Sequence, residues 1–160
     1  HRGRPYPGIY TKSMLTDLRA AVIQRLHGAN QRVTRNREAL VEILSDASRP
    51  MTLPEILKER PALAQSSAYR NLLALEQANV VRRVGGVDEF ARFELAEDLT
   101  EHHHHLICDR CGAVEDVDAP PGLENAVDKA VEEIEASHGF LVRHHRVDLV
   151  GTCATCASIK

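Results

Sequence analysis

Tryptophan is absent from this chain of 160 residues, and aromatic side chains make up only 4% of it. That scarcity leaves little with which to line a substrate pocket. No HExxH pair, nucleophile motif or phosphate-binding loop occurs, so the common catalytic motifs are missing. No apolar run approaches the roughly 20 residues that a membrane-spanning helix requires, and nothing signals secretion. We therefore expect a cytoplasmic protein that is not an enzyme and has no membrane partner.

Charge is divided unevenly along the chain, although the formal net charge of −3 is unremarkable. Residues 1–95 contain 15 Lys and Arg against 10 Asp and Glu, whereas residues 96–160 contain 5 against 13. A basic part joined to an acidic part indicates one domain that faces nucleic acid and a second domain with another task. The length is sufficient for one ordinary domain or two small ones.

Only four cysteines occur, and they form two Cys-x-x-Cys pairs: Cys108 with Cys111, and Cys153 with Cys156. Two such pairs brought together by folding make a tetrahedral zinc site with four thiolate ligands, which is closed and structural. Two disulfides are the alternative, but disulfides belong to oxidising compartments and paired Cys-x-x-Cys motifs suit a metal. The sequence therefore predicts a structural Zn²⁺ ion.

Four consecutive histidines, residues 102–105, precede the first cysteine pair and lead into a Leu-Ile pair. This pattern predicts a strand that enters the Cys-x-x-Cys turn. Side chains alternate between the two faces of a strand, so His103 and His105 should face one way and His102 and His104 the other. One run could thus contribute to two separate metal sites. A solvated polar loop and an expression tag are the alternatives, although tags stand at chain ends.

Helices and a hairpin are predicted before residue 96. An N-terminal arm, residues 1–16, is expected to be disordered or an expression remnant. The first predicted helix runs from Asp17 to Gly28, and the second begins after Thr34, which caps it. The third begins at the capping box Thr52-Leu-Pro-Glu55 and ends at about Arg60. The fourth runs from Ser67 to about Ala78, with Ser66 as its cap. Strands at Val80–Val84 and Phe90–Leu95 flank a Gly85-Gly86 turn. This order predicts a winged-helix domain over residues 17–95.

The helix predicted at Ser67–Ala78 is the one expected to enter the DNA major groove, because the second helix of a helix-turn-helix does so with its N-terminal side chains. Arg35 and Arg37 lie in the first turn of the helix predicted after Thr34. Their positive charges oppose the macrodipole of that helix, which favours an external anionic partner. A single arginine is usually a solvated surface charge, but a cluster of them favours DNA. The candidate DNA-binding residues are Arg35, Arg37, Ser67, Tyr69, Arg70, Arg82 and Arg83, with Arg92 also on the hairpin.

The remaining sequence predicts a short hinge, residues 96–101, followed by a small α/β domain, residues 102–160. Two strands, an amphipathic helix and a final strand are expected there: the histidine run, the segment around Val114 and Val117, Leu123–Ile134 ended by His138-Gly139, and Phe140–Val150. The expected fold class is therefore α+β, with an N-terminal winged-helix DNA-binding domain and a small C-terminal α/β domain.

Several motifs together resemble those of the ferric uptake regulator family of metal-dependent repressors. They are Ser67-Ala-Tyr-Arg70, Phe93-Glu94-Leu95, the HHHHLIC run, Cys108-x-x-Cys111-Gly112, Ser137-His-Gly-Phe140, His145 and Gly151-Thr-Cys153-x-x-Cys156. The resemblance spans about Asp17 to Ala157. It implies a homodimer that joins through its C-terminal domain and binds double-stranded operator DNA when metal is bound. Two recognition helices related by a twofold axis would read an inverted repeat.

The same resemblance implies three metal sites. The structural zinc site would be formed by Cys108, Cys111, Cys153 and Cys156, the regulatory site at the hinge by Glu94, His103 and His105, and a second site by His102, His104, Asp128 and His145. An ion at the hinge would be bound by both domains, and would therefore fix the separation of the two winged helices.

The predicted regulatory site departs from the family pattern. Many members have a ligand just before the third helix, where this chain has Arg49-Pro50, and zinc-sensing members often have aspartate at the position of Arg82. We expect Glu97, Asp98, Glu101 or water to complete the site. Imidazole and carboxylate ligands suit Zn²⁺, Fe²⁺, Mn²⁺ and Ni²⁺ alike, so the sequence favours Zn²⁺ only slightly over Fe²⁺.

The sequence thus predicts a metal-dependent repressor of metal-homeostasis genes that responds to zinc or iron, a zinc uptake regulator being one such form. A peroxide-, manganese- or nickel-responsive regulator of the same family is an alternative. Another class of alternative is a metallohydrolase, because histidines and a carboxylate can hold a catalytic metal. A metal-storage protein is the final alternative, but metal storage does not require a winged helix.

Overall fold

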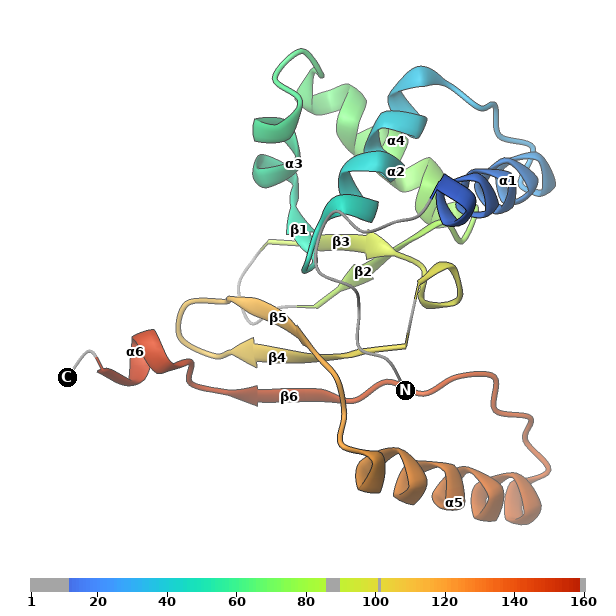
Figure 1. The fold of residues 1–160 in the computed structure, drawn as a ribbon, viewed down its shortest axis with the longest axis vertical. Helices are drawn as coiled ribbons and strands as arrows, with labels where there is room; N and C mark the ends of the chain where they lie inside the picture. Colours follow the sequence, from blue (N-terminus) through green and yellow to red (C-terminus); the bar gives the residue numbers. More distant parts are fainter. Residues whose placement is uncertain (1–11, 86–89, 101, 159–160) are drawn as a thin grey trace.

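The computed structural model describes residues 12–85, 90–100 and 102–158 (Figure 1). In chain order its elements are α1 (Lys12–Gly28), α2 (Arg35–Asp46), β1 (Met51–Thr52), α3 (Leu53–Glu59), α4 (Gln65–Gln77), β2 (Val81–Val84), β3 (Arg92–Leu95), the 3-10 helix η1 (Glu97–Leu99), β4 (His104–Cys108), β5 (Val114–Val117), α5 (Pro121–His138), β6 (Asp148–Gly151) and α6 (Ala154–Ser158). The strands form two three-stranded sheets, in the orders β1-β3-β2 and β5-β4-β6.

The N-terminal sheet is antiparallel throughout, and α1 to α4 gather on one side of it (Figure 1). The main hydrophobic core lies between them and includes Leu26, Leu40, Leu72 and Phe93, all fully buried. Side-chain caps begin two of these helices. Thr34 accepts a hydrogen bond from the backbone N–H of Arg37 at the start of α2, and Thr52 forms a capping box with Glu55 at α3. Helices packed on a small sheet in this order form the predicted winged helix.

Two local predictions in this region were wrong. The first helix begins at Lys12, inside the arm predicted to be disordered, and residues 1–11 of that arm lie outside the described residues. Helix α4 begins at Gln65 after an Ala64 N-cap with no side-chain hydrogen bond, so Ser66 is not the cap. A helix end at the surface can leave its first N–H groups to water, which removes the need for a capping side chain. The predicted glycine turn includes residues 86–89, which are not among those described.

The C-terminal sheet is mixed, because β4 pairs antiparallel with β5 and parallel with β6. Its register places His105 between Asp116 on one neighbour and Asp148 on the other. Helix α5 lies beyond this sheet in Figure 1 and ends at Gly139, which has the left-handed φ of 61° that glycine adopts without strain. The final strand is shorter than the predicted Phe140–Val150, because only Asp148–Gly151 runs beside β4 and finds hydrogen-bond partners there.

A small apolar cluster joins the two sheets: Val84 of β2 packs with Ile107 of β4 and Val114 of β5. This contact holds the edge of the winged helix against the histidine strand. The predicted α+β class is confirmed, with an N-terminal helical region and a C-terminal β-sheet domain. Across the described residues, no helix combines the length and the apolar character that crossing a bilayer requires.

Candidate metal sites

The four cysteines converge at one end of the C-terminal sheet. Cys108 ends β4, Cys111 follows in the adjoining turn, and Cys153 and Cys156 come just after β6. No cysteine of the chain is in a disulfide, and the four sulfurs all lie within 4.8 Å of one another. The Sγ atoms of Cys111 and Cys153 are 3.8 Å apart. Sulfurs held about 2.3 Å from a tetrahedral zinc ion are themselves roughly 3.8 Å apart, so this cysteine cluster fits Zn²⁺.

Backbone amides prepare this cluster for thiolate ligands. The N–H groups of Cys153, Cys111 and Arg110 point at the Cys108 sulfur and lower the pKa of its thiol to about 6. The neighbouring sulfurs of Cys153 and Cys111 have the opposite effect on Cys156 and raise the pKa of its thiol to about 12. Four adjacent thiolates repel one another, and a dication is the partner that compensates their charge.

The four histidines divide between two faces of the strand, as the alternation along a β-strand predicted. His103 and His105 join Glu94 and Asp116 in one group, which we call the junction cluster because it lies where the two sheets meet. His102 and His104 join Glu124 and His145 in another, the second cluster. In each group the candidate ligand atoms lie within 4.8 Å of one another.

The junction cluster is nearly inaccessible to solvent and draws its members from both regions of the chain. Glu94 belongs to β3 of the winged helix, and its Oε2 lies 3.1 Å from Nε2 of His103 and 3.3 Å from Nε2 of His105. Asp116, on β5, approaches the same two imidazoles at 3.9 and 3.8 Å. Behind His105, Asp148 lies 3.1 Å from Nδ1 and so aims Nε2 at the cluster. A carboxylate behind a histidine in this way is typical of metal sites.

Glu94 is charged although it is buried. Burial alone would raise the pKa of its carboxyl group, but hydrogen bonds with His103 and His105 and the charge of Arg82 outweigh burial and hold that pKa well below its usual range. A carboxylate with one oxygen facing two imidazoles is a ligand ready for a divalent cation. The junction cluster therefore offers two imidazoles and two carboxylates, without a thiolate.

The second cluster lies on the opposite face of β4 and involves the first turn of α5. Glu124 Oε1 is 2.5 Å from His104 Nε2, and Glu124 Oε2 is 3.4 Å from His145 Nε2 and 3.6 Å from His102 Nε2. The Nε2 atom of His145 is buried and makes no hydrogen bond, although Glu124 Oε2 lies 3.4 Å away. A buried imidazole nitrogen without a hydrogen bond costs free energy, and a cation between the imidazoles and the carboxylate would bind it, so this cluster also fits a metal ion.

The structure places Glu124 where the sequence predicted Asp128. Asp128 is one helical turn further along α5 and is exposed. The residues expected to complete the regulatory site also lie elsewhere: Glu97 contacts Arg82 and His102, and Asp98 pairs with Arg25. Glu101 falls outside the described residues. Asp116 is the fourth member of the junction cluster instead, and its place opposite His105 in the β4–β5 register is the signal that sequence reasoning missed.

The predicted DNA-binding residues divide into exposed and engaged groups. Arg35, Arg70 and Tyr69 are exposed on α2 and α4, and Ser67 is half-buried in the first turn of α4. The guanidinium of Arg37 is held by Asn71, Gln31 and the carbonyl of Arg32, while Arg83 pairs with Glu76. Arg92 is 5% exposed, and Arg82 binds Glu94 and Glu97, so the expectation that these two reach DNA phosphates was wrong.

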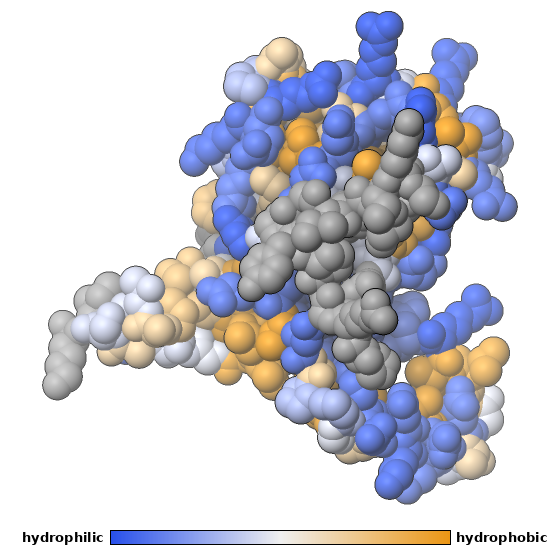
Figure 2. Space-filling view, in the orientation of Figure 1, coloured by the Kyte–Doolittle hydropathy of each residue, from blue (hydrophilic) through white to orange (hydrophobic). Residues whose placement is uncertain are grey.

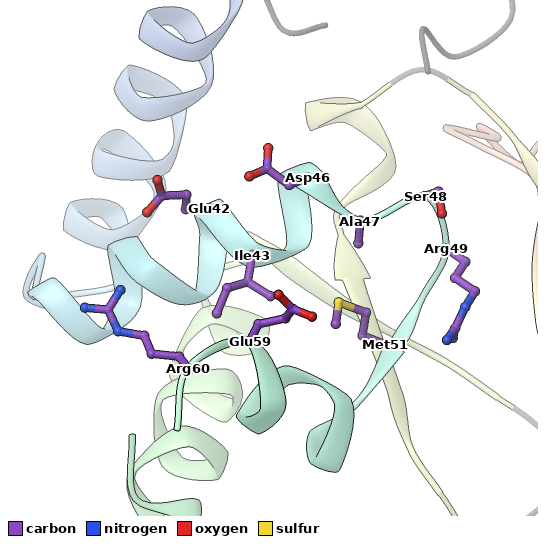
Figure 3. Close-up of a pocket in the computed structure, with 9 residues that line it drawn as sticks. All are labelled: Glu42, Ile43, Asp46, Ala47, Ser48, Arg49, Met51, Glu59 and Arg60. Carbon is purple, nitrogen blue, oxygen red and sulfur yellow. The ribbon is translucent and has the colours of Figure 1, made fainter. Parts of the chain in front are cut away.

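One cleft of the N-terminal region lies apart from all three clusters (Figure 3). It has a volume of about 520 Å³ and is lined by the ends of α2 and α3, including Glu42, Asp46, Glu59 and Arg60. Its lining contains neither histidine nor cysteine. This cleft is therefore separate from the candidate metal ligands, whereas a larger cavity of about 1140 Å³ is lined by Arg82, Glu97 and His102 and borders the second cluster.

Comparisons with known proteins agree with this geometry. Residues 28–150 match the model of the ferric uptake regulator family. The ferric uptake regulation protein of Bacillus subtilis (strain 168) is 30% identical over 139 residues, which cover 83% of this chain and 90% of that protein. The peroxide operon regulator of the same strain is 30% identical over 141 residues, covering 84% and 90%.

The fold is likewise that of solved regulators. The structure of the ferric uptake regulator Fur of Helicobacter pylori, described as having three functional metal binding sites, superposes with a TM-score of 0.69 at 24% identity. That match covers 94% of this chain and 96% of the other. The chain belongs to the ferric uptake regulator family of metal-responsive, DNA-binding transcriptional repressors, which are not enzymes.

Proposed function

We propose that this protein represses transcription when a divalent cation, Zn²⁺ or Fe²⁺, is bound at the junction cluster. The observation that carries the proposal is the origin of the four side chains. Glu94 comes from the winged helix, whereas His103, His105 and Asp116 come from the C-terminal sheet. A bound cation would supply Lewis-acid bonds to ligands from both regions at once, and would thereby favour the arrangement in which those ligands are close together.

The chain's own residues hold the ligands of the junction cluster close together before a cation binds. Asp148 fixes the ring of His105, and the Val84 contact with the C-terminal sheet keeps β2, the neighbour of Glu94's strand, close to β4. The cation changes the balance between conformations only through its different affinity for them, and such coupling is usually about 1–3 kcal/mol. The winged helices would then be presented to DNA in one preferred arrangement.

The nature of the ligands bears on which metal is sensed. Two imidazoles and two carboxylates suit Zn²⁺, Fe²⁺ and Mn²⁺, and no soft thiolate is present in the junction cluster to exclude iron. The ferric uptake and peroxide operon regulators of Bacillus subtilis are equally identical to this chain, so a peroxide response is the second candidate. For the cysteine cluster we propose Zn²⁺, because four thiolates in this arrangement are its usual structural site.

A homodimer is proposed from the exposed apolar surface of the C-terminal region. Phe140 and Leu141 are 64% and 74% exposed, and Leu149 and Val150 of β6 are also exposed. Figure 2 shows hydrophobic surface over the C-terminal sheet and beside α5. An apolar surface of this kind marks an interaction site. A second copy on a twofold axis would cover it and direct two α4 helices at an inverted repeat.

The proposed function is tested by DNA binding with and without metal. Protein with zinc in its cysteine cluster is used to select duplexes from a random pool, with added Zn²⁺, Fe²⁺ under anaerobic conditions, or Mn²⁺. Fluorescence anisotropy then measures the affinity for the selected operator before and after a chelator removes the weakly bound metal. We expect the affinity to fall by about fivefold or more on chelation and the operator to be an inverted repeat. Equal affinity in both conditions would refute metal control.

Arg70→Ala should weaken binding to the operator more than binding to random duplex. Arg70 is exposed in the first turns of α4, with only its Nε engaged by the carbonyl of Ser66, so its terminal nitrogens can reach a base edge. A bidentate contact with guanine contributes about 1–3 kcal/mol of discrimination. The measurement is anisotropy against both duplexes at two salt concentrations.

The matched comparison for that variant is Arg35→Ala, which removes an exposed arginine at the first position of α2. A phosphate contact should weaken both duplexes alike and lower the salt dependence, because each neutralised phosphate releases counterions. If Arg70→Ala behaves in the same way as Arg35→Ala, Arg70 contacts the backbone and does not read bases.

A further inference from the structure

Arg82 is partly buried, and its guanidinium lies against the carboxylates of Glu94 and Glu97. It stands opposite Glu94 in the β2–β3 register, and its side chain is only 18% exposed. Its Nε donates a hydrogen bond of 2.5 Å to Glu94 Oε1, and its Nη1 donates one of 2.9 Å to Glu97 Oε2. A permanently charged guanidinium is thus held directly against a member of the junction cluster.

We propose that Arg82 is a resident counter-cation that sets the metal affinity of the junction cluster. The inference rests on the proposed function, since it assumes that this cluster binds the regulatory ion. The two oxygens of Glu94 are divided between partners: Oε1 faces Arg82, whereas Oε2 faces His103 and His105. Glu94 can therefore offer one oxygen to an incoming ion, and part of its charge is already compensated.

The guanidinium is also prevented from moving away. Glu97 holds its far side, and the other oxygen of Glu97 contacts Nδ1 of His102. The Nε2 atom of His102 faces Glu124 in the second cluster. Arg82 is consequently fixed between carboxylates that touch both histidine clusters. An ion entering the junction cluster would meet a fixed positive charge, and in a buried site such a charge is poorly screened.

Arg82→Gln should therefore tighten metal binding at the junction cluster by roughly tenfold or more, because it removes a unit positive charge that repels the ion across a few ångströms of protein interior. Arg82→Lys should remain within a few-fold of the parent, because it keeps the charge. Glu97→Gln should weaken binding, because the whole charge of Arg82 would then act on Glu94. A purely supporting role for Arg82 predicts the opposite sign for Arg82→Gln, since the orientation of Glu94 would be lost.

The experiment measures Zn²⁺ affinity by competition with a chromophoric chelator, using full-length protein with zinc in its cysteine cluster. All variants carry His145→Ala, which disables the second cluster without touching Arg82. Arg25→Gln is the matched control: it removes a neighbouring guanidinium that pairs with Asp98 and with no member of the junction cluster. Circular dichroism shows whether each variant is folded. If Arg82→Gln does not fold, the weaker Zn²⁺ binding expected of Glu97→Gln still tests the proposal.

The possible outcomes distinguish a failure of the inference about Arg82 from a failure of the proposed function. A parent that binds one more Zn²⁺ ion than its His103→Ala/His105→Ala derivative, with tighter binding in Arg82→Gln, supports both. If that ion is present but Arg82→Gln binds it equally or more weakly, the inference alone is overturned. The same holds if Arg82→Gln leaves Zn²⁺ affinity unchanged and weakens DNA binding instead. If the parent and the double-histidine derivative bind the same number of ions, both proposals fail.

Discussion

Cys153→Ser should lose one zinc ion per chain and unfold the C-terminal domain. The described residues of this region have little hydrophobic core of their own: α5 and β6 contribute no buried residue, and Ile107 and Val114 are its main buried apolar side chains. The cysteine cluster instead ties the end of β4 to the segment after β6. Structural zinc contributes on the order of 10 kcal/mol in small domains, which is comparable to the whole stability of an ordinary domain.

Zinc content by mass spectrometry, far-ultraviolet circular dichroism and size-exclusion chromatography follow this change together. Thr155→Ala is the control, because Thr155 is an exposed residue of α6 beside the cysteines and belongs to no cluster. We expect the control to retain zinc and its oligomeric state, and Cys153→Ser to elute as an unfolded or monomeric species. A Cys153→Ser protein that is folded, dimeric and still carries all of its metal would show that the cysteine cluster is not structural.

The double substitution His103→Ala with His105→Ala should abolish the effect of metal on DNA affinity. Both imidazoles are buried and face Glu94, so their loss removes half of the candidate ligands of the junction cluster. The expected loss in saturating metal is about 5- to 150-fold in operator affinity, which corresponds to a coupling of about 1–3 kcal/mol. Because the cysteine cluster is intact, the variant should remain a folded dimer.

Anisotropy with the selected operator measures this loss, and His144→Ala provides the matched control. His144 is an exposed histidine that belongs to none of the three clusters. It neighbours His145 in the sequence, so the control also shows how the segment tolerates substitution. Unchanged operator affinity of the double variant in saturating metal would rule out the junction cluster as the sensor.

Local patterns predicted much of this molecule because local physics determines it. The Thr52 capping box formed as predicted, since it depends only on residues three positions apart. The division of the histidines matches the two-residue period of a strand, although only His104 and His105 lie in β4 and His102 and His103 precede it. The convergence of the two Cys-x-x-Cys motifs was also predictable, because few arrangements other than a zinc site use such pairs.

The errors in the candidate sites concern relations between distant segments. Asp128 and Glu124 lie one turn apart on α5, and only the packing of that helix beside β4 decides which of them meets the histidines. Asp116 depends on the register between β4 and β5, which the sequence around it does not specify. Arg82 was predicted to contact DNA phosphates because its partners, Glu94 and Glu97, lie 12 and 15 positions further along the chain and were not anticipated.

The central claim is that metal at the junction cluster and operator DNA at the winged helices affect each other's binding. Thermodynamic linkage requires that DNA alters metal affinity by the same factor by which metal alters DNA affinity. The most direct measurement is therefore the Zn²⁺ affinity of the zinc-loaded protein with and without saturating operator, for the parent and for His103→Ala/His105→Ala. We predict that operator tightens Zn²⁺ binding about 5- to 150-fold in the parent, and that the double variant loses this Zn²⁺ site. Equal Zn²⁺ affinity in the presence and absence of bound operator would contradict the account.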